Sequence, residues 1–314
     1  MAKLESRKYH IYLLFGFFFI VYICRLFYVQ IIEKEFFVDR AKTDAVDKVV
    51  EFPVRGNIYD RNGKVLVQNE IAYDVMLTMK DFKVDTLKFC ALLKIDTSEF
   101  KLRLKKIKNK SINKGYSSRI PQVFESLMKS EDFGGIKERL FNYKGVSVKK
   151  RTVRSYPRPI AAHVLGHVSK VGPRDLNRDQ FYIPQDYRGS SGLELFYEKE
   201  LRGAKGWHHY LKNRHGKYIS KYLNGALDTT PRLGNNLKST LDADLQEYGE
   251  MLMTGKIGAI VAIEPSTGEI LAMINAPTYD PNLLVGGEYG TNYQRLAKDK
   301  KKILFPRSIQ SRQP

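Results

Sequence analysis

Residues 52–69 read FPVRGNIYDRNGKVLVQN, and this stretch decides how the chain folds behind its first apolar segment. Short apolar runs flank a polar centre and can form two strands, at 54–59 and 64–67. Asn62-Gly63 supplies the positive φ that a tight turn requires. The pattern predicts a β-hairpin, although an Asn-Gly hairpin alone indicates no function.

The segment before the hairpin has the composition of a membrane anchor. Residues 11–24, IYLLFGFFFIVYIC, are unbroken apolar or aromatic. With its flanks to residue 32 the segment has about 20–24 residues, enough to cross roughly 30 Å of hydrocarbon as a helix. A cleaved signal peptide is the alternative, but no small-x-small cleavage site follows. The basic residues before the run predict a cytoplasmic N-terminus and an external chain beyond about residue 33; they are Lys3, Arg7 and Lys8.

The composition narrows the class of partner. The 314 residues include 53 Lys and Arg against 34 Asp and Glu, a formal net charge of +19. Either nucleic acid or anionic lipid or polymer could balance this charge. We favour lipid or polymer and expect no nucleic-acid partner, because the lysines are spread along the chain and no nucleic-acid motif is present. The only cysteines are Cys24, in the apolar run, and Cys90, so we expect no disulfide and no metal site.

Three further blocks follow the hairpin in order. They are RSYPRPIAAHVLGHVSKVG at 154–172, GSSGLELFYEKELRGAKG at 189–206 and IGAIVAIEPSTGEILAMINAPTYDPN at 257–282. Together with Arg55-Gly56 and Asp60-Arg61-Asn62-Gly63 they resemble class B penicillin-binding proteins, whose R-G-x-I-x-D-R-N-G signature follows the membrane anchor. The third block is more similar to the elongation-type (penicillin-binding protein 2) branch than to the division-type branch.

The resemblance implies a multidomain α+β protein. Residues 1–32 would be the cytoplasmic tail and transmembrane helix, and 33–239 a mixed α+β, non-catalytic pedestal with a small helical head at about 80–145. Residues 240–314 would begin an α/β penicillin-binding transpeptidase domain. The signature residues would be structural partners in the pedestal rather than catalysts; they are Arg55, Gly56, Asp60, Arg61, Asn62, Gly63 and Glu194.

Local patterns predict the helices. Ser191-Gly-Leu-Glu194 fits a capping box, followed by one helix that ends at Gly203. Its apolar face would hold Leu193, Phe196, Tyr197 and Leu201, which makes Glu194 a structural residue rather than an acid catalyst. In the head we expect helices at 86–95, after Asp96, and through Phe133, Ile136 and Leu140, with the lysines on a solvated face.

The last part of the chain predicts a helix and a buried hairpin. A helix from Thr240 would place Leu241, Leu245, Tyr248 and Leu252 on one face. GAIVAIE and EILAMIN read as two strands joined by a turn at 265–268. Both strands are almost continuously apolar, so we expect both faces of this hairpin to be covered.

The catalytic motifs of the resembled family are not found where that family has them. Its chemistry uses a Ser in S-x-x-K, an S-x-N motif and a K-T-G or K-S-G strand. No K-T-G or K-S-G occurs, and Ser111-Ile-Asn113 fits S-x-N. S-x-x-K occurs at Ser98/Lys101, Ser111/Lys114 and Ser126/Lys129, all in the Lys-rich head, where such matches are expected by chance. Aligning Pro306-Arg307-Ser308 with the family's Asn-Arg-Ala places the serine just after Pro314, so we expect a truncated chain without a catalytic residue.

The resemblance implies a single-pass protein of the bacterial cytoplasmic membrane with its bulk in the periplasm or outside. Its parent would be a D,D-transpeptidase that cross-links peptidoglycan stem peptides through a serine acyl-enzyme, binds β-lactams and needs no cofactor. A multi-pass lipid II polymerase is the implied protein partner. The alternatives are a non-catalytic membrane scaffold and the division-type transpeptidase. An S-x-x-K just beyond Pro314 in the gene would favour the enzyme, and a stop codon the scaffold.

Overall fold

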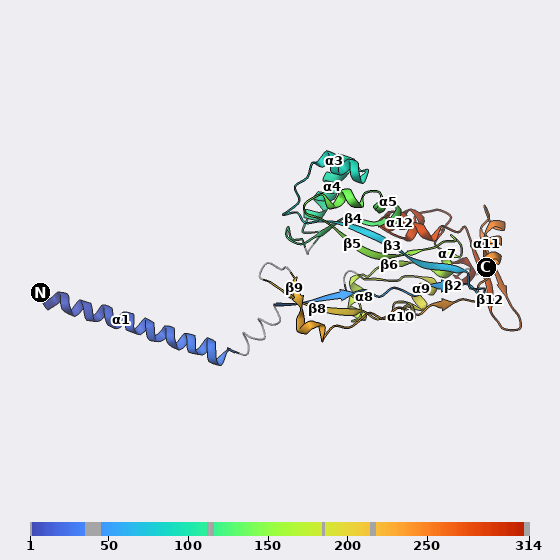
Figure 1. The fold of residues 1–314 in the computed structure, drawn as a ribbon. Coiled ribbons are helices and arrows are strands. Elements are labelled where there is room, and N and C mark those ends of the chain that lie inside the picture. The colour runs from blue at the N-terminus through green and yellow to red at the C-terminus, as the bar shows by residue number, and fades with distance from the viewer. Residues whose placement is uncertain are drawn as a thin grey trace. The chain divides into compact units, whose positions relative to one another are not determined.

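The computed structural model describes residues 2–34, 45–111, 113, 116–183, 186–213 and 218–310. The chain divides into two compact units, drawn in Figure 1. Unit 1 is Met1–Phe52 with Lys205–Arg232, and unit 2 is Pro53–Ala204 with Leu233–Pro314. The segment 205–232 thus groups with the N-terminal part of the chain, whereas the domain borders proposed at 32 and 239 stay predictions.

Unit 1 contains the apolar helix and a small sheet. Helix α1 (Ala2–Phe27) continues into a π-helical turn, η1 (Tyr28–Ile32). Tyr12–Ile32 has a mean hydropathy of 2.0 and no buried residue, and among the described residues it is the one helix long and apolar enough to cross a membrane. The strands β1 (Val46–Glu51), β8 (Gly206–Lys212) and β9 (Tyr218–Lys221) form an antiparallel sheet in the order β1-β8-β9, followed by the 3-10 turn η2 (Tyr222–Gly225).

The predicted hairpin is present at the start of unit 2 as β2 (Ile58–Tyr59) and β3 (Val65–Leu77). The first strand is shorter than the predicted 54–59, because the preceding backbone bonds elsewhere. The amide of Gly56 donates to the carbonyl of Leu201 at 2.9 Å, and the amide of Asn57 donates to Asn236 Oδ1 at 2.8 Å. In the turn itself, Gly63 has a φ of +86°, which its missing Cβ permits.

Strand β3 is the centre of the unit 2 sheet. Strands β4 (Gln122–Lys129) and β5 (Val146–Ser155) pair with the same residues of β3 and therefore lie on its two edges. The short β10 (Leu237–Lys238) runs parallel to β2. One apolar core contains Leu66 and Val67 from the first part of β3, and a second contains Val75 and Leu77 from its end.

The second core belongs to the head. Helices α3 (Thr86–Leu93) and α4 (Thr97–Lys108) form where predicted, with the side chains of Asp85 and Asp96 accepting from first-turn amides. The predicted third helix is wrong as a single element: it is two short helices, α5 (Ser130–Gly134) and α6 (Lys137–Phe141), because Gly134-Gly135 interrupts it. The head also contains β4, so it is not purely helical.

The middle of unit 2 corrects the predicted capping box. Its elements are α7 (Ala162–Leu165), β6 (Val168–Lys170), α8 (Pro173–Arg178), β7 (Tyr187–Gly189), α9 (Gly192–Phe196) and α10 (Glu198–Leu201). Ser191 is the N-cap residue of α9, but its side chain makes no cap hydrogen bond. Its hydroxyl lies 3.0 Å from His167 Nδ1, and Glu194 turns to arginines instead of reaching back.

The single helix predicted after Ser191 is likewise two helices, broken at Tyr197. Phe196, expected on the apolar face, is 79% exposed, whereas Glu194 is fully buried. The rest of the predicted apolar face does reach the core, since Leu201 is fully buried and Leu193 and Tyr197 pack against the same cluster. Gly203, with a φ of +67°, follows the second helix as predicted.

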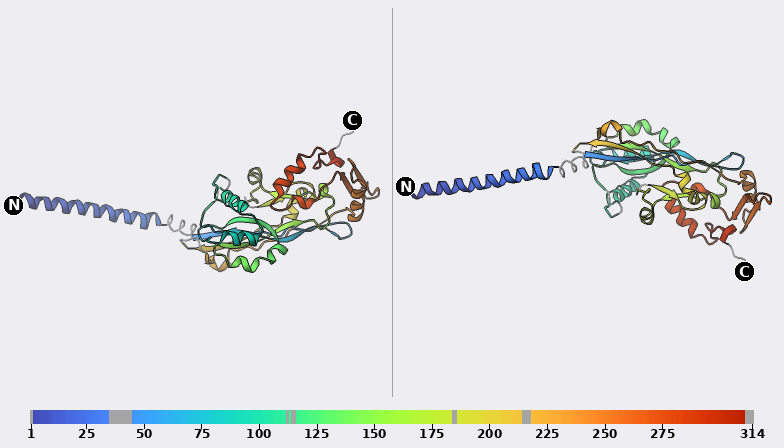
Figure 2. Two further views of the ribbon diagram at one scale, coloured as in Figure 1. Left: turned by 90° about the horizontal axis from the view of Figure 1, so that it is seen from above. Right: turned by 90° about the horizontal axis from the view of Figure 1, so that it is seen from below.

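The last elements of unit 2 are α11 (Ala243–Leu252), β11 (Gly258–Ile263), β12 (Ile270–Ala276), η3 (Pro281–Leu284), α12 (Tyr289–Ala297) and α13 (Arg307–Gln310). Helix α11 begins at Ala243, capped by Asp242, rather than at Thr240. The predicted antiparallel hairpin of β11 and β12 is confirmed. In Figures 1 and 2 the head helices and this α11–β12 region lie at opposite ends of unit 2.

Two predictions for this region are wrong: the apolar face of helix α11 and the covering of both faces of the hairpin. Helix α11 buries Ala243, Gln246 and Gly249, whereas Leu245, Tyr248 and Leu252 are exposed. The small face packs on β12, where the side-chain amide of Gln246 bonds the backbone N–H and C=O of Met273 at 2.8 and 3.1 Å. Within the described residues, β11 exposes the apolar side chains of Ile260, Val261 and Ile263. The two faces of the hairpin are therefore not both covered.

Candidate functional site

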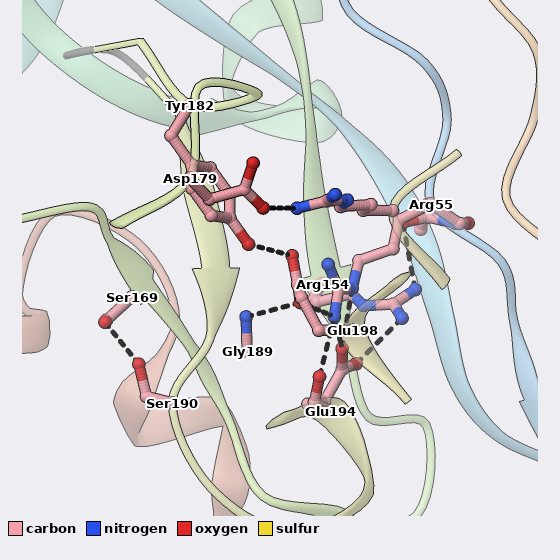
Figure 3. A network of polar contacts seen from close by, with 11 residues as sticks. Arg55, Arg154, Ser169, Asp179, Tyr182, Gly189, Ser190, Glu194 and Glu198 are labelled. Atoms are coloured by element: carbon pink, nitrogen blue, oxygen red, sulfur yellow. Dashed lines mark hydrogen bonds and ion pairs between the residues drawn. The ribbon is translucent and has the colours of Figure 1, made fainter. Parts of the chain in front are cut away.

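Arg55, from the stretch before β2, lies between two carboxylates of α9 and α10. Its Nε donates to Glu194 Oε2 at 2.6 Å, and its Nη2 donates to Glu198 Oε2 at 2.6 Å. The same Nη2 also donates to the backbone carbonyl of Glu194 at 3.0 Å. Figure 3 shows the guanidinium pointing at both glutamates. One arginine therefore joins the hairpin to two consecutive helices 139 and 143 residues further along the chain.

A second arginine completes the network from the end of β5. Arg154 Nη2 forms an ion pair with Glu194 Oε1 at 2.7 Å, without hydrogen-bond alignment. Its Nη1 donates to Asn69 Oδ1 at 3.1 Å, and Asn69 Nδ2 donates to the carbonyl of Arg55 at 2.5 Å. The segment before β2 and the end of β5 thus both contact the fully buried Glu194, and Asn69 of β3 links their two arginines.

The network contains two positive and two negative side chains, so its formal charge is balanced. Burial by itself would lower the pKa of Arg55, but the charges of Glu194 and Glu198 raise it above its usual value. Burial lowers the pKa of Arg154, which also faces the positive charge of Arg55. Removing one carboxylate from such a site leaves an uncompensated buried charge. The arrangement is suited to holding segments together rather than to proton transfer.

An outer layer of polar groups surrounds Glu198. Its Oε2 also accepts from the Gly189 amide at 2.8 Å, and its Oε1 accepts from the Tyr182 hydroxyl at 2.9 Å. A Cβ at Gly189 would lie 1.9 Å from the carbonyl oxygen of Glu194, so only glycine fits there. Beside this layer, Arg202 bonds Asp179 at 2.7 Å. These contacts, also drawn in Figure 3, fix the carboxylate of Glu198 from several sides.

The Asp60 turn is a second cluster of signature residues. Asp60 is fully buried, and its Oδ1 accepts from the amides of Asn62 and Lys64 at 2.8 and 2.6 Å. Its Oδ2 accepts from the amide of Ala243 at 3.3 Å, an otherwise unpaired donor in the first turn of α11. One carboxylate therefore shapes the turn and binds the start of α11.

The other residues of the turn contact the same region. The amide of Arg61 donates to the carbonyl of Leu241 at 2.9 Å. The Arg61 guanidinium lies 3.7 and 3.5 Å from the carboxylates of Glu264 and Glu269, which flank the β11–β12 turn. Asn62 Nδ2 donates to Asp242 Oδ2 at 3.1 Å. The turn thus touches the start of α11 and the end of the following hairpin.

Gly56 has a role in the close packing of this region. A Cβ at Gly56 would lie 1.8 Å from the carbonyl oxygen of Asn235, so a larger residue cannot occupy this position without backbone movement. The packing allows the Gly56 amide to bond Leu201, three residues after Glu198. All seven signature residues are therefore placed in two clusters, around Glu194 and around Asp60.

The three S-x-x-K matches in the head begin on a helix, a turn and a strand. Ser98 is an exposed residue of the first turn of α4, and its hydroxyl bonds Asp96. Ser126 lies in strand β4, and the side chain of Lys129 is outside the described part of the structure. Ser111 is exposed, and Lys114 lies outside the described residues. In the one of these matches whose two side chains are both described, Ser98/Lys101, the serine hydroxyl bonds Asp96 and not the lysine that acyl transfer would require.

Two residues of the network, Arg154 and Glu198, were not predicted from the sequence as site residues. Both lie inside blocks that were recognised, at the start of RSYP and in FYEK. The sequence alone does not show which arginines and glutamates pair across the chain, so no signal identified these two residues. Among the described residues no group of three or more His, Cys, Asp or Glu is placed to hold a metal ion, and Cys24 and Cys90 are free.

The fold and these clusters define a pedestal of the type found in penicillin-binding proteins. Residues 50–239 match the Penicillin-binding Protein dimerisation domain, and the chain belongs to the class B penicillin-binding proteins, of the penicillin-binding protein 2 type. It is 32% identical to peptidoglycan D,D-transpeptidase MrdA of Salmonella typhimurium, over 94% of this chain and 47% of that protein. MrdA of Escherichia coli K12 is 30% identical, over 94% of this chain and 46% of that protein.

Solved structures agree with this assignment. The penicillin-binding protein 2 of Helicobacter pylori in its complex with MreC matches with a TM-score of 0.65 and 25% identity, covering 83% of this chain and 49% of that chain. The same protein without MreC matches with a TM-score of 0.58. The chain spans about half the length of the curated relatives it matches.

Proposed function

We propose that this chain is the membrane anchor, the pedestal and the first part of the catalytic domain of a peptidoglycan D,D-transpeptidase of cell-wall elongation. The observation that carries the proposal is the Asp60 turn. It joins the hairpin to the first turn of α11 and to the β11–β12 turn through Asp60, Arg61 and Asn62. A pedestal that holds the first elements of a catalytic domain needs such a joint, and the named relatives are transpeptidases.

In this proposal the signature residues are structural. Arg55, Glu194 and Glu198 hold the pedestal, and Asp60 and Arg61 hold the beginning of the catalytic domain. The reaction itself, acylation of a serine in S-x-x-K by a stem peptide or a β-lactam, would use none of these residues. No cofactor enters that chemistry, which uses only a nucleophile, a base and oxyanion donors.

Labelled penicillin tests the enzyme assignment. A chain extended along its gene through a full catalytic domain should form a covalent adduct at a serine just beyond Pro314. The 314-residue chain should form none, because its S-x-x-K serines, among them Ser98, Ser111 and Ser126, do not follow the β11–β12 hairpin at the family's spacing. Stoichiometric labelling of the short chain at one of these serines would overturn the assignment, and a stop codon after Pro314 would favour a non-catalytic scaffold.

Arg55→Ala separates a structural role from a chemical one. We expect the variant to lose about 1–3 kcal/mol of unfolding free energy, because buried charged hydrogen bonds are removed. In the extended chain it should still be acylated wherever it remains folded, as judged by circular dichroism. A folded Arg55→Ala protein without acylation would contradict the pedestal role.

We further propose that the chain is a single-pass protein of the bacterial cytoplasmic membrane with its N-terminus inside. The support is the apolar span Tyr12–Ile32 preceded by Lys3, Arg7 and Lys8. A reporter fused after about residue 40 should be active only if it folds outside the cytoplasm. Activity of a reporter that works only in the cytoplasm would contradict this orientation.

The proposed protein partners are a multi-pass lipid II polymerase and a relative of MreC, the protein bound in the H. pylori complex. Co-purification from detergent-solubilised membranes tests both. An elongation-type chain should retain the side-wall polymerase, whereas retention of the septal polymerase would assign it to the division-type branch.

A further inference from the structure

Helix α4 in the head carries a concentration of positive charge that the pedestal contacts leave unused. Residues 94–110 contain seven basic and two acidic residues, a formal net charge of +5 out of +19 for the whole chain. The lysines of this segment are all exposed; they are Lys94, Lys101, Lys105, Lys106, Lys108 and Lys110. Their placement is ordered, because the helix that carries most of them is held from its other side.

The inner face of α4 is part of the head core. Phe100 and Ile107 are buried there, and Leu104 packs against the same cluster. Phe100 contacts Phe89 and Phe124, with ring centroids 6.0 and 5.4 Å apart. Because these residues fix the rotation of the helix, the remaining positions point outward. The helix therefore presents one face to solvent and cannot turn it inward.

The outer face, called the α4 lysine face here, consists of Lys101, Lys105, Lys106 and Lys108 with the half-exposed Leu102. Lys101, Lys105 and Lys108 follow the i, i+4, i+7 spacing of a single helix face and span about 10 Å along the axis. Leu102 is the one large apolar side chain that this face exposes.

The carboxylates near this face are already engaged. Glu99 accepts from Arg103 at 2.6 Å, and Glu125 on β4 pairs with the same guanidinium. Asp96 accepts from the amide of Ser98 at 3.1 Å. In the described part of the chain no carboxylate forms an ion pair with the lysines of the α4 lysine face. The helix dipole favours cations in the last turn, but it does not account for Lys101 in the second turn.

We propose that the α4 lysine face is a docking surface for the carboxylate-bearing peptides of the peptidoglycan polymer. This inference rests on the proposed function, since a transpeptidase meets that polymer as its substrate and product. The lysine side chains are flexible point charges that suit repeated, mobile anions. Several weak contacts to one polymer add up through their high effective concentration.

Two other partners fit the face less well. A folded protein would need a desolvated apolar or aromatic centre, and the face offers only Leu102. A membrane surface would take up the apolar side of an amphipathic helix, but in α4 that side is buried in the head core. The charge complementarity therefore favours a soluble, extended polyanion.

The test is co-sedimentation of the full 314-residue chain, in neutral detergent, with purified peptidoglycan sacculi. The variant replaces Lys101, Lys105, Lys106 and Lys108 by Gln. The matched control replaces Lys298, Lys300, Lys301 and Lys302 by Gln, which removes the same charge from another exposed Lys-rich segment. Both variants are checked for an unchanged melting temperature.

We expect the α4 variant to reduce the bound fraction at least about fivefold at low salt, because four attractive contacts are lost together. The control should bind like the unmodified chain, and roughly 0.5 M salt should abolish the difference by screening. Sacculi whose carboxylates have been amidated should not bind the unmodified chain. Equal binding by the two variants, whether both fall or neither does, would overturn the proposal.

A competition arm separates a lipid partner from the polymer. Soluble peptidoglycan stem peptides, or glycerophosphoglycerol as the headgroup of phosphatidylglycerol, are added separately to the sacculus assay. If glycerophosphoglycerol releases the unmodified chain and the stem peptides do not, the face binds lipid headgroups and the proposal is wrong. Penicillin labelling of the extended chain is scored separately, so a failure of the transpeptidase assignment is distinguishable from a failure of the lysine face.

Discussion

The two cores that share strand β3 are held in different ways. The head core, at the end of β3, is built from apolar and aromatic side chains around Phe89, Phe124 and Leu140. The core at the start of β3 also contains apolar residues, including Ile58 and Leu66, but a buried network of two arginines and two glutamates adjoins it.

An apolar core and a buried ionic network differ in how precisely they determine which segments of the chain meet. Apolar burial is non-directional and roughly proportional to area, so the head tolerates exchange of one apolar side chain for another of similar volume. A buried charge needs its partner at one distance and angle, and it is costly when that partner is missing. The network therefore sets which distant segments meet, whereas the head core mainly holds neighbours together.

The largest expected effect is that of Glu194→Ala. The change leaves Arg154 without a carboxylate and Arg55 with Glu198 alone, so we expect a loss of about 3–5 kcal/mol in unfolding free energy. Urea unfolding followed by circular dichroism measures it. Glu200→Ala, on the exposed side of α10, is the control and should stay within about 0.5 kcal/mol. A similar cost for both would remove the contrast between the two cores.

Leu140→Ala in the head should cost roughly 3 kcal/mol, because it leaves a cavity beside a fully buried position. Phe141→Ala, the next residue on α6 but 61% exposed, should cost no more than about 0.5 kcal/mol. Leu140→Met preserves volume and should cost less than about 1.5 kcal/mol.

Glu194→Gln sharpens the comparison because it preserves volume and removes only the charge. We expect most of the Glu194→Ala cost to persist in this variant, measured in the same urea titrations. If Glu194→Gln and Leu140→Met both left the unfolding free energy nearly unchanged, side-chain volume rather than charge would determine the stability of both cores.

The smallest effect concerns pH and His163, whose Nε2 donates to the carbonyl oxygen of Ile303 at 2.7 Å and whose ring contacts the ring of Tyr279 edge-on. Burial lowers the pKa of His163, and the charge of Arg307 adds to this, against the opposing hydrogen bond to Ile303. Because the pKa of His163 is lower in the folded than in the unfolded state, neutral His163 stabilises the fold fully above the unfolded pKa of about 6.5. This stabilisation is lost as the pH falls below that value and through the folded-state pKa.

The measurement for this effect is the urea midpoint at pH 7.5 and pH 5.5. The unmodified chain should show a larger fall between the two pH values than His163→Gln, which cannot take up a proton. An identical fall in both proteins would show that His163 does not contribute to the acid sensitivity. His167, whose pKa burial also lowers, remains in both proteins and cancels in the comparison.

Much of the local structure was readable from the sequence. The apolar helix, the hairpin around Asn62-Gly63, the capped helices after Asp85 and Asp96 and the β11–β12 hairpin all form where their patterns place them. Each depends on interactions between residues close in the chain: capping, turn conformation and side-chain periodicity. The order of the four sequence blocks also indicated the family, which the comparisons show.

Other features were decided by contacts between distant segments. The capping box at Ser191 and the single helix after it were wrong: the side chains of Glu194 and Glu198 bond Arg55, a residue far away in the chain, and the helix breaks at Tyr197. Likewise, α11 turns its small face to β12 through Gln246, against its apolar periodicity. Sequence by itself determined the elements and the family. Only the tertiary structure decided which charges meet, since the pairing of buried groups depends on the position of every segment that surrounds them.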